Sequence, residues 1–148
     1  MSNITSLLSA IEGLSVSDGV STPTCLNLTE TPGAVDSMDT PVRILLPQDD
    51  IGNQTFEFIS LGQGNKIDWH IEELYLCMPV AEGRGWKDVG NKLYTYIANF
   101  AAAVVAARST ICGYEMNVMD ITPRRGTWQW GDRWYYGVRT SLTVREFS

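Results

Sequence analysis

Long hydrophobic runs are missing from this chain of 148 residues. A membrane-spanning helix needs about 18–20 apolar residues, and the best stretch here, 97–107, is short and rich in alanine. The first residues carry no basic segment followed by a continuous apolar one, so we predict no signal peptide. Cysteine is scarce, with three residues at no regular spacing, which is typical of free thiols in a reducing compartment rather than of a disulfide framework.

Positive charge is scarce in the first half of the chain. Residues 1–73 hold eleven of the 17 acids but two of the 11 bases, a net charge of −9, and the remaining six acids and nine bases give residues 74–148 a net charge of +3. Regions of opposite sign can face each other within one fold or between copies of the chain. The pI of about 4.6 works against any partner recognised mainly through phosphates.

Hydrophobic periodicity predicts two helices and five main strands. The clearest pattern is a row of apolar residues three or four apart between Trp86 and Val104, which predicts a helix over 86–107 with Leu93, Ile97 and Phe100 packed on a sheet. Alternation or short apolar runs between turn residues predict the strands. The expected elements are a short helix over 3–14, strands over 41–47, 55–61, 67–78, 111–118 and 134–147, and a turn over 62–66.

Residues 15–40 contain few apolar residues and no clear period. A connection of this length is uncommon within a compact domain, so we predict an extended arm, with a short strand at 25–28 as an option. The change of apolar parity at residues 72–73 indicates either a β-bulge there or a strand buried on both faces. The whole chain, 1–148, is predicted to form one α+β domain: an N-terminal helix (1–14), the arm (15–40) and a core (41–148) in which a small, mainly antiparallel sheet carries both helices.

The chain has a single histidine, His70, between acids on a predicted strand. Because side chains alternate along a strand, Asp68, His70 and Glu72 project to one side and could hold a metal ion. The simpler interpretation is the polar face of a half-buried strand, since no second histidine or cysteine lies nearby. No nucleophile signature has local support, and the glycine pairs at 62–64 and 83–85 lack the residues of phosphate loops. We therefore expect no catalytic, metal-binding or cofactor-binding residues and no enzymatic activity.

The most unusual segment interleaves arginine with tryptophan near the C-terminus, and we expect it to be a long hairpin loop joining the last two strands. Tryptophan and arginine are the residues enriched at protein–protein hot spots, so an oligomer interface is the first hypothesis. Intramolecular packing of the tryptophans and stacking on nucleic-acid bases are the alternatives. The candidate interface residues are Arg124, Arg125, Trp128, Trp130 and Arg133.

The order of these patterns resembles the tail-terminator proteins of long-tailed bacteriophages over nearly the whole chain. The resemblance rests on the initial helix, the proline-preceded strand at 40–46, the His-Ile-Glu strand that ends in an apolar-proline step at 69–79, the long amphipathic helix, the Gly-Tyr strand start at 113–114 and the aromatic last strand at 134–147.

The resemblance implies a structural virion protein without cofactors that forms a ring, of six copies in that family, at the head-proximal end of the tail. Such a ring terminates the tail tube and joins it to the head connector. The implied partners are further copies of the chain, a tail-tube protein and a connector or neck protein, with no membrane and at most incidental nucleic acid in the lumen. The implied locations are the virion tail or neck and the host cytoplasm during assembly. Another phage neck or head-completion protein and a nucleic-acid-binding protein using 124–133 remain the alternatives.

Overall fold

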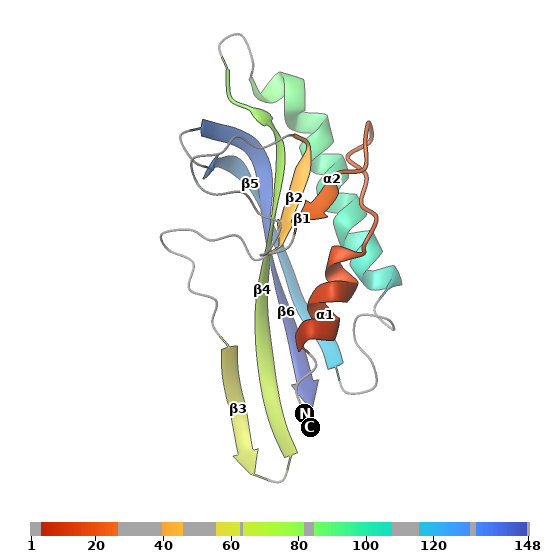
Figure 1. The fold of residues 1–148 in the computed structure, drawn as a ribbon, viewed down its shortest axis with the longest axis vertical. Coiled ribbons are helices and arrows are strands. Elements are labelled where there is room, and N and C mark those ends of the chain that lie inside the picture. The colour runs from red at the N-terminus through yellow and green to blue at the C-terminus, as the bar shows by residue number, and fades with distance from the viewer. Residues whose placement is uncertain are drawn as a thin grey trace.

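The protein is an α+β fold in which two helices pack on one mixed, mostly antiparallel sheet (Figure 1). The computed structural model describes residues 4–26, 40–45, 56–62, 64–81, 85–107, 116–130 and 133–147. The elements are α1 (Ile4–Glu12), β1 (Thr24–Leu26), β2 (Val42–Leu45), β3 (Phe56–Gly62), β4 (Gly64–Pro79), α2 (Trp86–Ala106), β5 (Met116–Trp130) and β6 (Arg133–Phe147).

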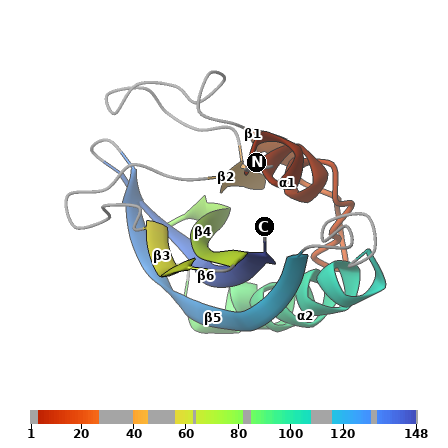
Figure 2. The same ribbon diagram turned by 90° about the horizontal axis from the view of Figure 1, so that it is seen from below.

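Three long strands form the frame of the sheet. The strand order is β1-β2-β4-β6-β5, and β3 pairs with the first part of β4 beside this path. Only β1 and β2 run parallel among these pairs. Figure 2 shows that the sheet is strongly curved, with both helices on one side of it. The ladder between β4 and β6 joins residues 66–79 to residues 135–147, so the two strands that run the length of the molecule come from distant parts of the sequence.

The two faces of the sheet carry different groups. On the helix face, odd-numbered β4 side chains such as Trp69, Ile71 and Tyr75 join the main core with both helices. On the opposite face, Leu74 and Leu76 of β4 join a second, smaller apolar cluster. The alternation of side chains along each strand therefore separates two cores across one sheet.

The long helix packs as its period predicts, with one adjustment. Val89, Leu93, Tyr96, Phe100 and Val104 are buried at spacings of three and four residues. The predicted burial of Leu93 and Phe100 is confirmed, whereas Ile97 is only half-buried because the centre of the buried face passes through Tyr96.

Strand β4 is buried on both faces over residues 73–77, which confirms the second of the two options for its parity change. The predicted bulge at 72–73 is wrong, because the register shift between β4 and β6 lies at Leu76/Met78. The predicted turn over 62–66 is shorter than expected, since β3 and β4 pair up to Gly62 and Gly64.

The start of the predicted arm is packed against the core. Val16 and Asp18 are buried, Asp18 accepts hydrogen bonds from the backbone of Val20 and Ser21 and from the Tyr75 hydroxyl, and β1 pairs with β2. The remainder of the arm, 27–39, lies outside the described residues, as does the predicted strand start at 111–115.

A buried arginine fastens α1 to the sheet. Arg43 of β2 donates to the carbonyl oxygens of Ile11 and Leu14, which lie at the C-terminal end of α1, at 3.2 and 2.6 Å. It also pairs with Glu73 of β4 at 2.7 Å, and the Tyr96 hydroxyl of α2 donates to the same carboxylate. Burial raises the pKa of the Glu73 carboxyl, and the Arg43 guanidinium opposes that rise. One arginine thus supplies the C-terminal cap and positive charge that the sequence of α1 lacks.

Candidate interaction surface

The segment expected to be a hairpin loop is the second half of a strand. β5 continues to Trp130, and its ladder with β6 runs from Met116↔Glu146 to Trp130↔Arg133. The loop prediction is wrong. Proline, glycine and two adjacent arginines are typical of loops, but here this segment forms a strand because its backbone pairs with the long β6. Pro123 is tolerated because β5 forms the edge of the sheet.

The strand geometry divides the predicted interface residues between the two faces. Trp128 and Trp130 lie on the face opposite the helices, where Trp130 is 8% exposed and Trp128 is half-buried. Their side chains pack within the chain, as the intramolecular alternative holds, although neither indole N–H has a hydrogen-bond acceptor among the described residues. The other members of this cluster are Val42, Ile44, Leu74, Leu76 and Tyr135, with Leu26 at its margin.

A pair of glycines makes room for Trp128. Gly126 and Gly137 are cross-strand partners in the β5–β6 ladder. A Cβ atom at Gly126 would lie 3.6 Å from the Trp128 ring, and one at Gly137 would lie 3.3 Å from it. The Arg139 guanidinium stands 5.7 Å from the centre of that ring, so Trp128 is held between a flat glycine floor and a cation.

The arginines of the segment stay exposed, and Arg125 is held in place by two rings. Its guanidinium lies 5.8 Å from the Trp86 ring and 5.2 Å from the Tyr94 ring of α2. Trp86 also makes an edge contact with Tyr136 of β6, at 4.9 Å between ring centres. Trp86 and Tyr94 are still about half exposed, at 45% and 55%. Sequence periodicity placed Trp86 on the buried face of the helix, but the first turn of α2 reaches only the margin of the sheet.

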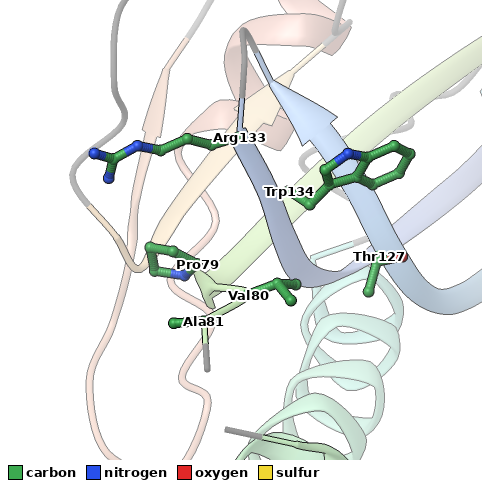
Figure 3. A pocket seen from close by; sticks show the side chains of 6 residues that line it. All are labelled: Pro79, Val80, Ala81, Thr127, Arg133 and Trp134. Atoms are coloured by element: carbon green, nitrogen blue, oxygen red, sulfur yellow. The ribbon is translucent and has the colours of Figure 1, made fainter. Parts of the chain in front are cut away.

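Beyond the start of α2 the helix face of the hairpin is uncovered. Trp134, two residues before Tyr136 on β6, is 51% exposed and was not among the predicted interface residues. It borders a pocket of about 550 Å³ between the end of β4 and the hairpin (Figure 3). The pocket is lined by Pro79, Val80, Ala81, Thr127, Arg133 and Trp134.

The polar half of the opposite face is a set of ion pairs between the two halves of the chain. Arg145 binds Asp68 at 2.9 Å, and Arg139 binds Glu72, which also lies 3.8 Å from Arg124. Hydrogen bonding to Arg145 holds the pKa of the Asp68 carboxyl below its usual range. The opposite charges noted in the sequence therefore meet within one fold at these positions.

The same pairs decide the chemistry around His70. The two acids that flank it in the strand are engaged by arginine, and its Nδ1 lies 3.2 Å from the Thr143 hydroxyl. No group of three metal-ligating side chains occurs in the described part of the chain. Asp68, His70 and Glu72 thus form a polar row on one face of β4, in contact with polar side chains of β6.

In comparisons with known proteins, no family model matches the chain and no curated protein matches its sequence. Among the residues that the structure describes, no helix combines the length and the apolar character needed to cross a bilayer.

Proposed function

We propose that the protein is a structural virion protein that assembles into a ring at the head-proximal end of a phage tail, where it terminates the tail tube and joins it to the head connector. The observation that carries the proposal is the hairpin-end surface, defined as the exposed Trp86, Tyr94, Arg125, Arg133 and Trp134. Rigid aromatic rings and arginines are the side chains that dominate binding energy at protein interfaces. A surface of this kind favours a protein that assembles over one that turns over a small substrate.

The element order supports the same proposal. In the tail-terminator pattern a His-Ile-Glu strand, a long amphipathic helix and an aromatic last strand follow one another, and here these segments are β4, α2 and β6. The short initial helix and the proline-preceded strand are α1 and β2. The same order suits other neck or head-completion proteins, so the station within the virion follows from the partner that binds.

A closed ring needs two different surfaces on each copy, because its interfaces are head-to-tail. Each copy binds one neighbour through the first surface and the other neighbour through the second. The hairpin-end surface, together with the exposed Arg124, supplies a basic one. The acidic first half supplies its complement, but Asp68, Glu72 and Glu73 are already engaged within the chain.

The deciding experiment is a mass measurement of the purified chain, alone and with the tail-tube protein. The proposal expects a closed oligomer of fixed copy number, either alone or on the tube. Trp134→Ala should weaken assembly while leaving thermal unfolding unchanged. Val105→Ala removes a similarly exposed apolar side chain near the C-terminal end of α2 and should have no effect on assembly. A chain that stays monomeric in both settings over a wide concentration range contradicts the proposal.

Nucleic-acid binding is the second candidate, because Arg124, Arg125 and Arg133 are exposed and the Arg125 guanidinium lies over two exposed rings, Trp86 and Tyr94. Binding through phosphates falls steeply as salt rises. A DNA titration at low and moderate salt separates the two functions: the ring proposal expects weak binding that disappears at moderate salt, and tight binding at moderate salt favours the alternative.

A further inference from the structure

The pocket beside Trp134 exists because α2 begins too late to cover it. The first helical side chain, Trp86, packs on Tyr136, and Trp134 lies two residues further along the same face of β6. Two residues of strand span about 6.7 Å, so Trp134 lies one side-chain row beyond the row that is covered by the first residue of α2. The backbone N–H of Val80 donates to the Trp134 carbonyl at 2.8 Å, which fixes the floor of the pocket to the hairpin.

The walls of the pocket are mostly apolar and stay partly in water. Pro79, Val80, Ala81 and Trp134 form them, with Val80 exposed by 41%. Exposed apolar surface gathered in a concavity is stabilised when an apolar group covers it. A volume of about 550 Å³ lies within the range of small-ligand pockets and accommodates a large apolar side chain with part of its backbone.

Among the described residues that line the pocket, the charged one is an arginine. Arg133 lines it, and Arg125 lies two residues before the lining residue Thr127 on the same face of β5. Stacking on Trp86 and Tyr94 restrains the Arg125 side chain and leaves the edge of its guanidinium able to donate, which is how arginine binds carboxylates. The one exposed acid in the first turn of α2, Asp88, already accepts a hydrogen bond from the Gly85 N–H.

We propose that this pocket binds an acidic peptide segment of a partner protein, with one large apolar side chain against Trp134 and flanking carboxylates on Arg133 and Arg125. Its occupant is set by shape and charge together: an apolar cavity whose lining includes Arg133, with Arg125 two residues before the lining residue Thr127. Nucleic-acid bases fit less well, because Arg125 already covers the Trp86 and Tyr94 rings on which they would stack. Every group that builds the site belongs to one chain, but Arg125, Arg133 and Trp134 are also part of the hairpin-end surface, so peptide binding is measured at a chain concentration too low for assembly.

The test is a selection of peptides from a random displayed library on the full-length chain, followed by synthesis of the enriched peptide. We expect the enriched sequences to carry acids on both sides of a leucine, isoleucine, phenylalanine or tryptophan. Binding of the synthetic peptide, followed by calorimetry, should fall by about tenfold or more with Trp134→Ala. Arg133→Ser and Arg125→Ser should weaken it by several-fold, and their effect should shrink as salt rises.

Matched controls keep the outcome clear. Arg124→Ser removes the same charge from the neighbouring residue on the opposite face, and Val105→Ala removes a similarly exposed apolar group, so both should bind within about twofold of the unaltered chain. Three results overturn the inference: no enrichment, enriched peptides without acids, or Trp134 and Arg133 variants that bind the peptide as tightly as the unaltered chain does. So does an oligothymidylate that binds more tightly than the peptide and is sensitive to Trp134→Ala. If Trp134→Ala unfolds the chain, the two arginine variants decide. Ring formation is tested separately, by the mass measurement of the assembled protein described above.

Discussion

At Gly137, β6 lies too close to the backbone of β4 to leave room for a side chain. A Cβ atom there would lie 2.1 Å from the backbone oxygen of Tyr75, a distance that no real contact shows. The neighbouring atoms are backbone, so they cannot rotate away as a side chain would. Close approach of β4 to β6 thus depends on the missing side chain at one position.

Gly137→Ala should therefore lower the free energy of unfolding by about 3 kcal/mol or more, at the upper end of overpacking effects. Gly126→Ala, its cross-strand partner, meets only ordinary contacts with the Trp128 ring and should cost much less. Urea unfolding of both variants measures the difference. Equal losses would show that the strain at Gly137 is relieved by a backbone shift.

Asp68 gives the protein a pH dependence with a definite sign. Its folded pKa lies below the unfolded value of about 3.9, so its contribution to stability is complete above about pH 5 and is lost as the pH falls through the folded pKa. We expect Asp68→Asn to lower the free energy of unfolding by about 1–3 kcal/mol at pH 7, with the gap to the unaltered chain closing under strong acid. Denaturant unfolding at pH 7 and pH 2.5 measures this. A gap that stays constant would mean that the Arg145 pair contributes nothing.

At the scale of elements, the second half of β5 is held by its tryptophans. Trp130→Ala removes a ring from the cluster of Val42, Ile44, Leu74, Leu76 and Tyr135, and should lower the free energy of unfolding by about 3–5 kcal/mol. Trp130→Phe keeps most of the packing and removes an N–H that has no acceptor, so it should cost less than about 1.5 kcal/mol. Thermal unfolding of the two variants checks the contrast, and similar losses for both would show that the indole N–H finds a partner.

Docking of α1 depends on the Arg43–Glu73 pair. Arg43→Met leaves the Glu73 carboxylate buried without its partner and should cost about 3–5 kcal/mol. The double variant Arg43→Met/Glu73→Leu removes both charges and should be more stable than the single one. Denaturant unfolding of the set tests this; a double variant that loses as much as the sum of its parts would indicate that the bonds to the α1 carbonyl oxygens, and not the ion pair, dominate.

Elements whose own residues carry a period could be predicted from the sequence. The row from Val89 to Val104 fixes α2, and alternation fixes β6 and most of β4. The part of β5 beyond the predicted strand 111–118 could not be predicted, because residues 123–126 (proline, two arginines and glycine) become a strand only through pairing with β6. For the same reason the sequence predicted that Trp128 and Trp130 were accessible, whereas the structure buries Trp130 and half-buries Trp128. Of the three tryptophans of this hairpin, Trp134 is the exposed one. Which aromatic a helix covers depends on where the helix starts relative to the sheet, and no local pattern encodes that.

At the scale of the whole molecule, the fold uses its uneven charge internally. Asp68 and Glu72 from the acidic half meet Arg139 and Arg145 from the basic half across the β4–β6 ladder. Part of the charge asymmetry therefore stabilises a single copy, which is one of the two arrangements that the sequence allows.

The same ladder dictates an order of events during synthesis. β4 finds its main neighbour, β6, only after the intervening α2 and β5 have been made, with partners 56 to 81 residues apart along the chain, as in Pro79↔Tyr135 and Lys66↔Phe147. Closing loops of that size comes before any gain from the contacts they permit, so folding is slow compared with that of helical proteins of this length. Until β6 emerges, Leu74 and Leu76 have no long strand beside them on that side. A nascent chain that stalls before β6 is made would leave Leu74 and Leu76 exposed to other nascent chains. We therefore expect completion of the last strand to be the step that protects this protein from aggregation.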